Sequence, residues 1–218
     1  SSDLDYVQYF EKKLAKLFSL VPTKNWTQTL EFVKNRKCDL IPMLFKNKER
    51  EEYLNFSKNY LTFPLVLATR LEETFTNDVS SAFGKKVGYV KNYAYTEFFK
   101  KKYPKIELVA VESVIDGLEK VKNNKLYGVI GILPTIGYYI QKDYFTQLKV
   151  STKFDKEWSL YIGTRNDEAI LNSIMNKLID TITPEKHNEI YKNWVTVKYH
   201  ETIDLKKIIA ISSFLMLI

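Results

Sequence analysis

The chain has 218 residues, of which 45% are hydrophobic and 27% charged, a composition that supports a packed core and excludes intrinsic disorder. Its formal net charge of +7 raises the question of nucleic acid, but the lysines are scattered between hydrophobic runs and accompanied by acidic residues, which predicts a solvated surface and no nucleic-acid partner. The single cysteine, Cys38, excludes an internal disulfide, and both histidines, His187 and His200, lie far downstream, so we predict neither a metal nor a cofactor.

The first part of the chain alternates between helical and strand patterns. Apolar residues recur at steps of three and four over residues 4–17, which predicts an amphipathic helix. Residues 18–21 favour a short strand that Pro22 ends, and Asn25 is a candidate N-cap for a second helix. Residues 38–45 are typical of a buried strand.

The same alternation continues to the end of the chain. Further strands are predicted at residues 63–68, 86–90, 106–111, 126–133 and 158–163, and further helices at residues 95–102, 114–121, 135–141, 170–178 and 183–194. Strands that alternate with helices favour parallel α/β sheets. Strand–helix units on both sides of residues 63–69 predict two such sheets.

Several motifs, taken in order, resemble a known family. They are Trp26, Leu30, Asp39-Leu40 and Glu49-Arg50, then Tyr53, Phe56-Ser57 and Tyr60, then Gly84-Lys85-Lys86-Val87-Gly88, and finally Ile190-Tyr191 and Trp194. No single motif is specific, but the ordered set resembles the type 2 periplasmic solute-binding (Venus-flytrap) proteins, bacterial extracellular solute-binding family 3. Leu133-Pro134-Thr135 with Tyr138-Tyr139-Ile140 is similar to the sensor domains of membrane-bound histidine kinases and diguanylate cyclases.

The resemblance implies a two-lobed α/β fold of the periplasmic-binding-protein type, in which each lobe is a mostly parallel sheet flanked by helices. Two crossing strands, at residues 63–69 and 158–163, would act as the hinge. Lobe 1 is expected at residues 1–65 and 162–203, without the first strand that the family places there, and lobe 2 at residues 66–161.

The C-terminal end is apolar. Residues 208–218 carry no charge and follow Lys206 and Lys207, but this run is shorter than the about 20 apolar residues that cross a bilayer. We predict that residues 206–218 begin a transmembrane helix; the alternative is a C-terminal core helix or strand.

In this family the solute lies in the cleft between the lobes, and the arginine of the Glu-Arg motif typically pairs with a ligand carboxylate. That position is Arg50 here, and a planar guanidinium can meet a carboxylate with two parallel hydrogen bonds. The alternative is a surface arginine paired with Glu49, Glu51 or Glu52.

The other predicted ligand contacts follow strand ends. Met43 and Phe45 end a strand and are expected to line the lobe 1 wall, because ligands of open α/β sheets collect at the carboxyl ends of strands; a core role accounts for one of the two. The predicted contacts in lobe 2 are Asn92, Tyr93, Ala94 and Tyr95, in a turn before a helix whose N–H groups favour an anion. One of the two tyrosines is open to a second interpretation, packing under the helix.

Gly131 departs from the family pattern. Members that bind α-amino acids usually carry an Asp here that neutralises the ligand ammonium, and a buried unpaired ammonium is costly. The glycine therefore indicates either another acid or a ligand without an ammonium group. Trp26, Trp158 and Trp194 fall on apolar stripes or strands and are interpreted as structural.

The resulting hypothesis is a sensor domain on the periplasmic side of the bacterial inner membrane. It closes on a small polar or carboxylate-bearing ligand and signals through a C-terminal transmembrane helix to a cytoplasmic kinase or cyclase module, an arrangement compatible with a homodimeric full-length receptor. The main alternative is the solute receptor of an ABC transporter of the polar amino acid type. An enzyme of the dehydratase type is disfavoured because no acid/base pair stands out, so we expect this fragment to be no enzyme.

Overall fold

The computed structural model describes residues 2–76 and 78–194. Within these residues no helix is long and apolar enough to cross a membrane. The predicted start of a transmembrane helix at residues 206–218 lies outside the described residues, and so does the side chain of Trp194.

Helices and strands alternate along the described chain. The first elements are α1 (Ser2–Leu14), α2 (Trp26–Lys34), β1 (Leu40–Leu44), α3 (Lys48–Glu51), β2 (Leu54–Phe56) and β3 (Leu61–Arg70). The middle elements are η1 (Val79–Ala82), β4 (Lys86–Val90), α4 (Thr96–Lys102), β5 (Glu107–Val111), α5 (Val114–Lys122), β6 (Gly128–Ile132) and α6 (Leu133–Tyr139). The last are η2 (Ile140–Tyr144), β7 (Leu148–Arg165), α7 (Ala169–Asp180) and α8 (Pro184–Trp194).

The strands form a mixed sheet in the order β1-β7-β3-β6-β4-β5, with β2 also paired to β7. Among the described strands, the parallel pairs are β4 with β5 and β4 with β6. The pairing is more antiparallel than the alternation of elements predicts, because the long strands β3 and β7 run antiparallel to each other and β7 also pairs antiparallel with β1 and β2.

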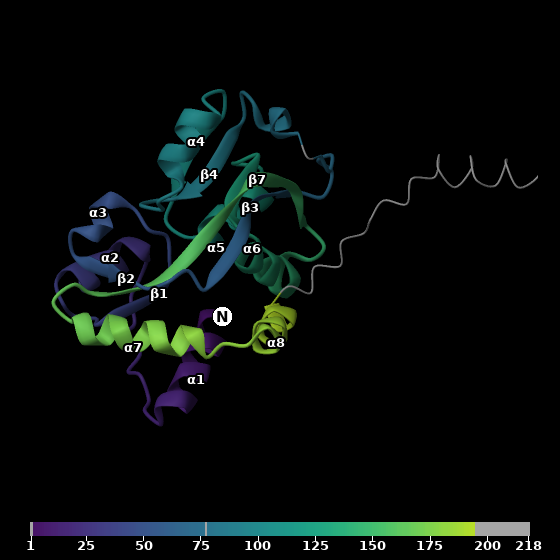
Figure 1. Ribbon diagram of the computed structural model, residues 1–218. Helices are drawn as coiled ribbons and strands as arrows, with labels where there is room; N and C mark the ends of the chain where they lie inside the picture. Colours follow the sequence, from purple (N-terminus) through teal and green to yellow (C-terminus); the bar gives the residue numbers. More distant parts are fainter. Residues whose placement is uncertain (1, 77, 195–218) are drawn as a thin grey trace, which may run out of the picture.

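β3 and β7 connect the two halves of the molecule. In Figure 1 they run between α4 and β4 at one end and α1 and α7 at the other. We call the half with α1–α3, β1, β2, α7 and α8 lobe 1, and the half with β4–β6 and α4–α6 lobe 2. The predicted lobe boundaries at residues 65 and 161 fall within β3 and β7 and stay a prediction.

Local capping follows the sequence signals. Asn25 caps α2 through its side-chain oxygen, which accepts a hydrogen bond of 3.0 Å from the Gln28 N–H. Ser113 caps α5 in the same way, accepting from the Asp116 N–H at 3.1 Å. Both side chains satisfy an N–H group that the first helical turn leaves without an intrahelical partner.

The predicted strand at residues 18–21 is wrong, because this segment pairs with no described strand. Leu20 within the segment and Leu17 just before it are 82% and 80% exposed, and a strand needs a partner for its backbone groups. β2 and the first half of β7 were not predicted from the sequence. Polar residues such as Lys153 and Asp155 interrupt the apolar pattern of that half of β7.

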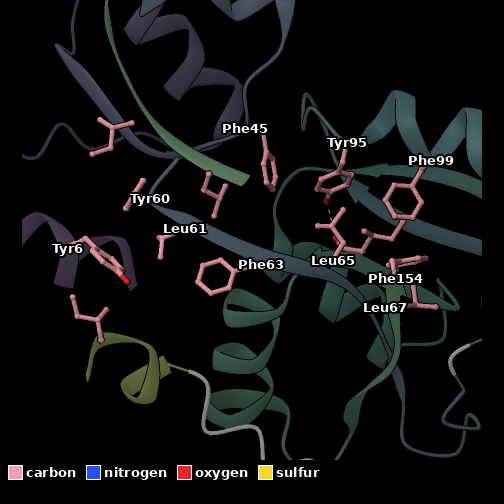
Figure 2. Close-up of a cluster of buried hydrophobic side chains, with 14 of the residues drawn as sticks. Tyr6, Phe45, Tyr60, Leu61, Phe63, Leu65, Leu67, Tyr95, Phe99 and Phe154 are labelled. Atoms are coloured by element: carbon pink, nitrogen blue, oxygen red, sulfur yellow. Dashed lines mark hydrogen bonds between the residues drawn. The ribbon is translucent and has the colours of Figure 1, made fainter. Parts of the chain in front are cut away.

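The largest core cluster lies on one face of β3 and extends through both lobes. Figure 2 shows it from Tyr6 and Tyr60 in lobe 1, past Phe63 and Leu65, to Phe99 and Phe154. A second cluster, which includes Val66, Val129 and Ile136, lies between the sheet and helices α5 and α6. Successive side chains of a strand point to opposite faces, so neighbouring residues of β3 contribute to different clusters.

Helix α1 is held to α8 by a tyrosine–histidine pair. The Tyr6 hydroxyl lies 2.8 Å from His187 Nδ1, and Tyr6 is 2% exposed. Burial lowers the pKa of His187 below its ordinary value of 6.5, because a poorly solvated site disfavours the imidazolium. The folded protein therefore binds a proton at His187 less readily than the unfolded chain.

We expect this difference to make folding pH-dependent. His187 contributes its full stability above about pH 6.5, and the contribution is lost as the pH falls through the lower pKa of the folded state. His187→Gln keeps an acceptor for Tyr6 but does not titrate. The wild type should therefore lose more melting temperature than His187→Gln between pH 7.5 and pH 5.5, as measured by differential scanning fluorimetry. Equal losses in the two proteins would contradict the assignment.

Candidate functional site

Arg50 is a buried cation at the boundary between the lobes. It lies in α3, where the Asn47 side chain caps the helix by accepting from the Arg50 N–H at 2.9 Å. Its side chain is nearly inaccessible, at 2% exposure, and burial lowers its pKa. An arginine nevertheless stays protonated in proteins, so Arg50 places a permanent positive charge in the interior.

The guanidinium of Arg50 joins the two lobes. Nη1 donates to the Phe45 carbonyl at 2.6 Å, and Nη2 donates to the Asn92 carbonyl of lobe 2 at 2.9 Å. The same Asn92 carbonyl accepts from the Trp26 indole at 3.3 Å, and Arg50 lies over the Trp26 ring. We call this group of Arg50, Trp26 and Asn92 the Asn92 contact.

The surface alternative for Arg50 is wrong. The side chain is buried, and within the described residues it forms no ion pair with Glu49, Glu51 or Glu52; Glu51 pairs instead with Lys46. The hydrogen-bond acceptors of Arg50 are neutral carbonyls. Among the described residues Glu49 acts on its charge through space, without a direct ion pair. An oxygen-rich anion is the ligand chemistry that such a site favours.

Asn92 adopts a backbone conformation that suits its role. Its φ is 63°, a left-handed value that asparagine tolerates better than most residues. The side-chain amide donates to Thr27 Oγ1 at 2.9 Å. Lobe 2 is thus attached to the start of α2 through both the carbonyl and the side chain of one residue.

Aromatic side chains fill the space next to the Asn92 contact. The Phe45 ring lies edge-on to Tyr95 and Trp158, with centroids 6.1 Å and 5.5 Å away, and the ring of Phe98 lies 5.4 Å from Trp158. Figure 2 shows Phe45 beside Tyr95. We call Phe45, Tyr95, Phe98 and Trp158 the inter-lobe aromatic cluster, because Phe45 comes from lobe 1, Tyr95 and Phe98 come from lobe 2, and Trp158 comes from β7.

The predicted lobe 2 contacts occupy different depths. Tyr95 is fully buried, and its hydroxyl donates to the Ile130 carbonyl at 3.0 Å, so it is the tyrosine that packs under the helix. Burial raises its pKa. Tyr93 is half-buried and lies edge-on to Trp26, and Ala94 packs against the large core.

Met43 marks an irregularity in β1. Its φ is 52°, and its N–H donates to the Tyr60 hydroxyl at 3.1 Å. The pairing of β1 with β7 shifts register between Ile41 and Leu44. Met43 itself packs against the large core.

Gly131 faces away from the aromatic cluster. A Cβ atom at this position would lie 2.8 Å from Ile136 Cγ1 of α6, and Ile136 belongs to the second core cluster. Its neighbours on β6, Ile130 and Ile132, contribute to the large core instead. The face of β6 that lies toward the aromatic cluster is therefore apolar. Ile132 on this face was not predicted as a site residue. The alternation of side chains along a strand could have indicated it.

Two tryptophans that the sequence analysis interpreted as structural lie at this boundary as well. Trp26 contributes to the Asn92 contact, and Trp158 to the aromatic cluster. The sequence could have indicated a site role for Trp26, because Trp26 belongs to the same family motif as Arg50. In addition, the structure places no group of three or more His, Cys, Asp or Glu side chains in a metal-binding arrangement within its described part.

The fold and the site together define a solute-binding protein of the Venus-flytrap type. The profile of the bacterial extracellular solute-binding proteins, family 3, matches residues 2–197, and the chain belongs to this family. Membership confirms the predicted two-lobed α/β class and the extracytoplasmic location.

Sensor proteins are among the relatives. The virulence sensor protein BvgS of Bordetella pertussis is 22% identical over 178 residues, which are 81% of this chain and 14% of the relative. The sensor protein EvgS of Escherichia coli K12 is 23% identical over 167 residues, 76% of this chain and 14% of the relative. The chain thus spans a small part of the length of these relatives.

Solved structures support the same fold. The periplasmic VFT2 domain of B. pertussis BvgS superposes with a TM-score of 0.81 at 20% identity, covering 89% of this chain and 83% of that domain. An ancestral arginine-binding protein bound to glutamine superposes with a TM-score of 0.78 at 16% identity, covering 89% and 87% of the two chains. At such identities the likeness shows the fold and not the ligand.

Proposed function

We propose that this chain is the periplasmic ligand-binding domain of an inner-membrane sensor and that it responds to a small carboxylate-bearing solute. The observation that carries the proposal is the buried guanidinium of Arg50, whose two acceptors, the carbonyls of Phe45 and Asn92, belong to different lobes. A ligand carboxylate offers the same guanidinium two charged acceptors in place of neutral ones. Binding would thus alter the bonds that join the lobes.

The apolar surroundings limit the ligand. Ile130 and Ile132 occupy the site face of β6, and the aromatic cluster contains no carboxylate that could neutralise an ammonium group. Burying an unpaired ammonium there is costly, so the proposal favours a carboxylate without one. Met43, Tyr93 and Ala94 remain proposed contacts at the edges of this site.

Helix α8 is the proposed output element. Tyr191 of α8 stacks on Phe63 of β3, with ring centroids 6.0 Å apart, and α8 also contacts α6 of lobe 2. A shift of lobe 2 about β3 and β7 would therefore reach α8, which leads toward the proposed transmembrane helix. The proposed output is a cytoplasmic kinase or cyclase module in a full-length receptor, and the proposed assembly is a homodimer. The relatives named as sensor proteins support a sensor function.

A ligand screen tests the proposal. We expect benzoate to raise the melting temperature, because a ligand that binds only the folded state at 100 times its Kd stabilises it by about 2.7 kcal/mol. L-arginine and L-glutamine serve as amino acid comparisons and benzylamine as the cationic comparison, all measured by differential scanning fluorimetry. If no carboxylate shifted the melting temperature, the proposed function would be wrong.

A second candidate is the receptor of an amino acid transporter. A substrate-binding protein of this kind from Streptococcus pneumoniae, bound to L-arginine, superposes with a TM-score of 0.75 at 22% identity. Stabilisation by L-arginine or L-glutamine without stabilisation by benzoate would favour this candidate. A continuous apolar span after Ile218 in the gene would count against it.

A further inference from the structure

Trp158 carries a buried hydrogen-bond donor without an acceptor. Its indole Nε1 is inaccessible to solvent, and none of the described residues accepts a hydrogen bond from it. Buried N–H groups in native proteins almost always have a partner, and one without a partner costs free energy. Such a group at the boundary between the two lobes of a binding protein indicates a position for a ligand acceptor.

The surroundings of this donor fit a flat, apolar body. Trp158 lies opposite Phe63 in the antiparallel pairing of β7 with β3, and its ring is edge-on to Phe45 of lobe 1 and Phe98 of lobe 2. Aromatic edges and faces on several sides favour a planar guest, which can stack or make edge contacts with each ring. A guest would enter as Phe45 and Phe98 separate with their lobes.

Two cations lie beside the same cluster. The Lys156 ammonium is 4.3 Å from the centroid of the Trp158 ring and 4.6 Å from that of Phe98, and the Lys156 side chain is exposed. On the other side, Phe45 connects the cluster to Arg50, because its carbonyl accepts from the guanidinium and its ring contacts Trp158. The cluster therefore has one cation over Trp158 and Phe98 and a second cation bonded to the backbone of Phe45, and both favour a negatively charged guest.

We propose that Trp158 is a ligand-contacting residue whose indole N–H donates to a carboxylate oxygen of an aromatic or similarly flat solute held by the inter-lobe aromatic cluster. This inference rests on the proposed function and adds to it the shape of the ligand and a second donor besides Arg50. The apolar strand interpretation of Trp158 accounts for its ring but leaves its N–H without a role.

The test uses benzoate as the probe and Trp158→Phe as the variant, which keeps an aromatic ring and removes the donor. Loss of a hydrogen bond to a charged acceptor should weaken benzoate binding about tenfold or more, as measured by isothermal titration calorimetry. Thr152→Val is the matched control, because Thr152 Oγ1 is also buried on β7 without a described partner. It should bind benzoate within about twofold of the wild type, since removing an unpaired hydroxyl removes no ligand bond.

A second readout does not require the variant to fold. In the wild type, the indole ¹H–¹⁵N resonance of Trp158, assigned through its contacts with the rings of Phe45 and Phe98, should move downfield with benzoate and stay in place with benzylamine. An unmoved resonance when benzoate binds overturns the role of Trp158 and leaves the proposed function standing. Binding of L-glutamine without binding of benzoate overturns the role of Trp158 and favours the transporter-receptor candidate. Failure of every carboxylate to bind overturns both.

Discussion

Arg50→Ala is expected to destabilise the protein by about 3 kcal/mol and to abolish stabilisation by carboxylates. The substitution removes the charged donor from two carbonyls, those of Phe45 and Asn92, and a hydrogen bond to a charged group contributes about 1.5 to 3 kcal/mol. In a chain of this size, 3 kcal/mol lowers the melting temperature by about 10 °C. Urea denaturation measures the loss of unfolding free energy, and scanning fluorimetry with benzoate measures the loss of the ligand response.

Two further variants separate the contribution of the planar guanidinium of Arg50 from that of its positive charge. Arg50→Lys keeps a cation but cannot donate two bonds in one plane, so we expect it to recover less than half of the lost stability. Lys48→Ala removes an exposed cation from the same helix and should change stability by less than about 0.5 kcal/mol. If Arg50→Ala left the free energy of unfolding unchanged, or if Lys48→Ala lowered it by as much, the role given to the Asn92 contact would be contradicted.

Introducing the family's acid at position 131 is expected to destabilise the protein by about 3 to 5 kcal/mol rather than to create an amino acid site. In Gly131→Asp the new Cβ would lie 2.8 Å from Ile136 Cγ1, and overpacking of this kind costs about 1 to 3 kcal/mol. The carboxylate would also be buried in an apolar cluster without a cation, which adds the cost of an uncompensated charge. Urea denaturation at pH 7 measures the total loss of unfolding free energy from both causes.

Smaller changes at the same place separate the two costs. Gly131→Ala adds only the steric conflict and should cost about 1 to 3 kcal/mol. Combining it with Ile136→Val shortens the side chain that the new methyl group meets, and the double variant should recover part of this loss. If Gly131→Asp were as stable as the wild type and bound L-glutamine, position 131 would face the ligand and not α6.

Local and motif-level features could be predicted from the sequence. Asn25 carries a short polar side chain directly before an apolar helical stripe, and it caps its helix as expected; Ser113 carries the same kind of side chain and caps α5. The strand at residues 86–90 has the predicted bounds, because Val87 and Val90 are buried and the residues between them are apolar or glycine. The ordered motifs around Arg50 indicated the family, which the comparison with its profile confirms.

Features that depend on a distant partner could not be predicted. Residues 18–21 have a strand pattern, but no described strand pairs with them. The hydrophobic pattern of a segment does not specify which strand it pairs with. Position 131 was expected to face the ligand, yet strand alternation turns it toward Ile136 and presents Ile130 and Ile132 to the large core. Trp158 reads as core along the chain, and its unpaired indole N–H is visible only once Phe45 and Phe98 surround it.

The sequence by itself determined the fold class, the family and the presence of an arginine at the family's ligand-pairing position, because these depend on periodicity and on residue types at short spacings. Only the tertiary structure decided what that arginine meets. Asn92 lies 42 residues away from Arg50 along the chain, and its carbonyl reaches the guanidinium because β3 and β7 bring the lobes together and a left-handed backbone at Asn92 turns the carbonyl toward it. Contacts of this kind depend on the relative placement of two separately folded surfaces, which no local pattern encodes.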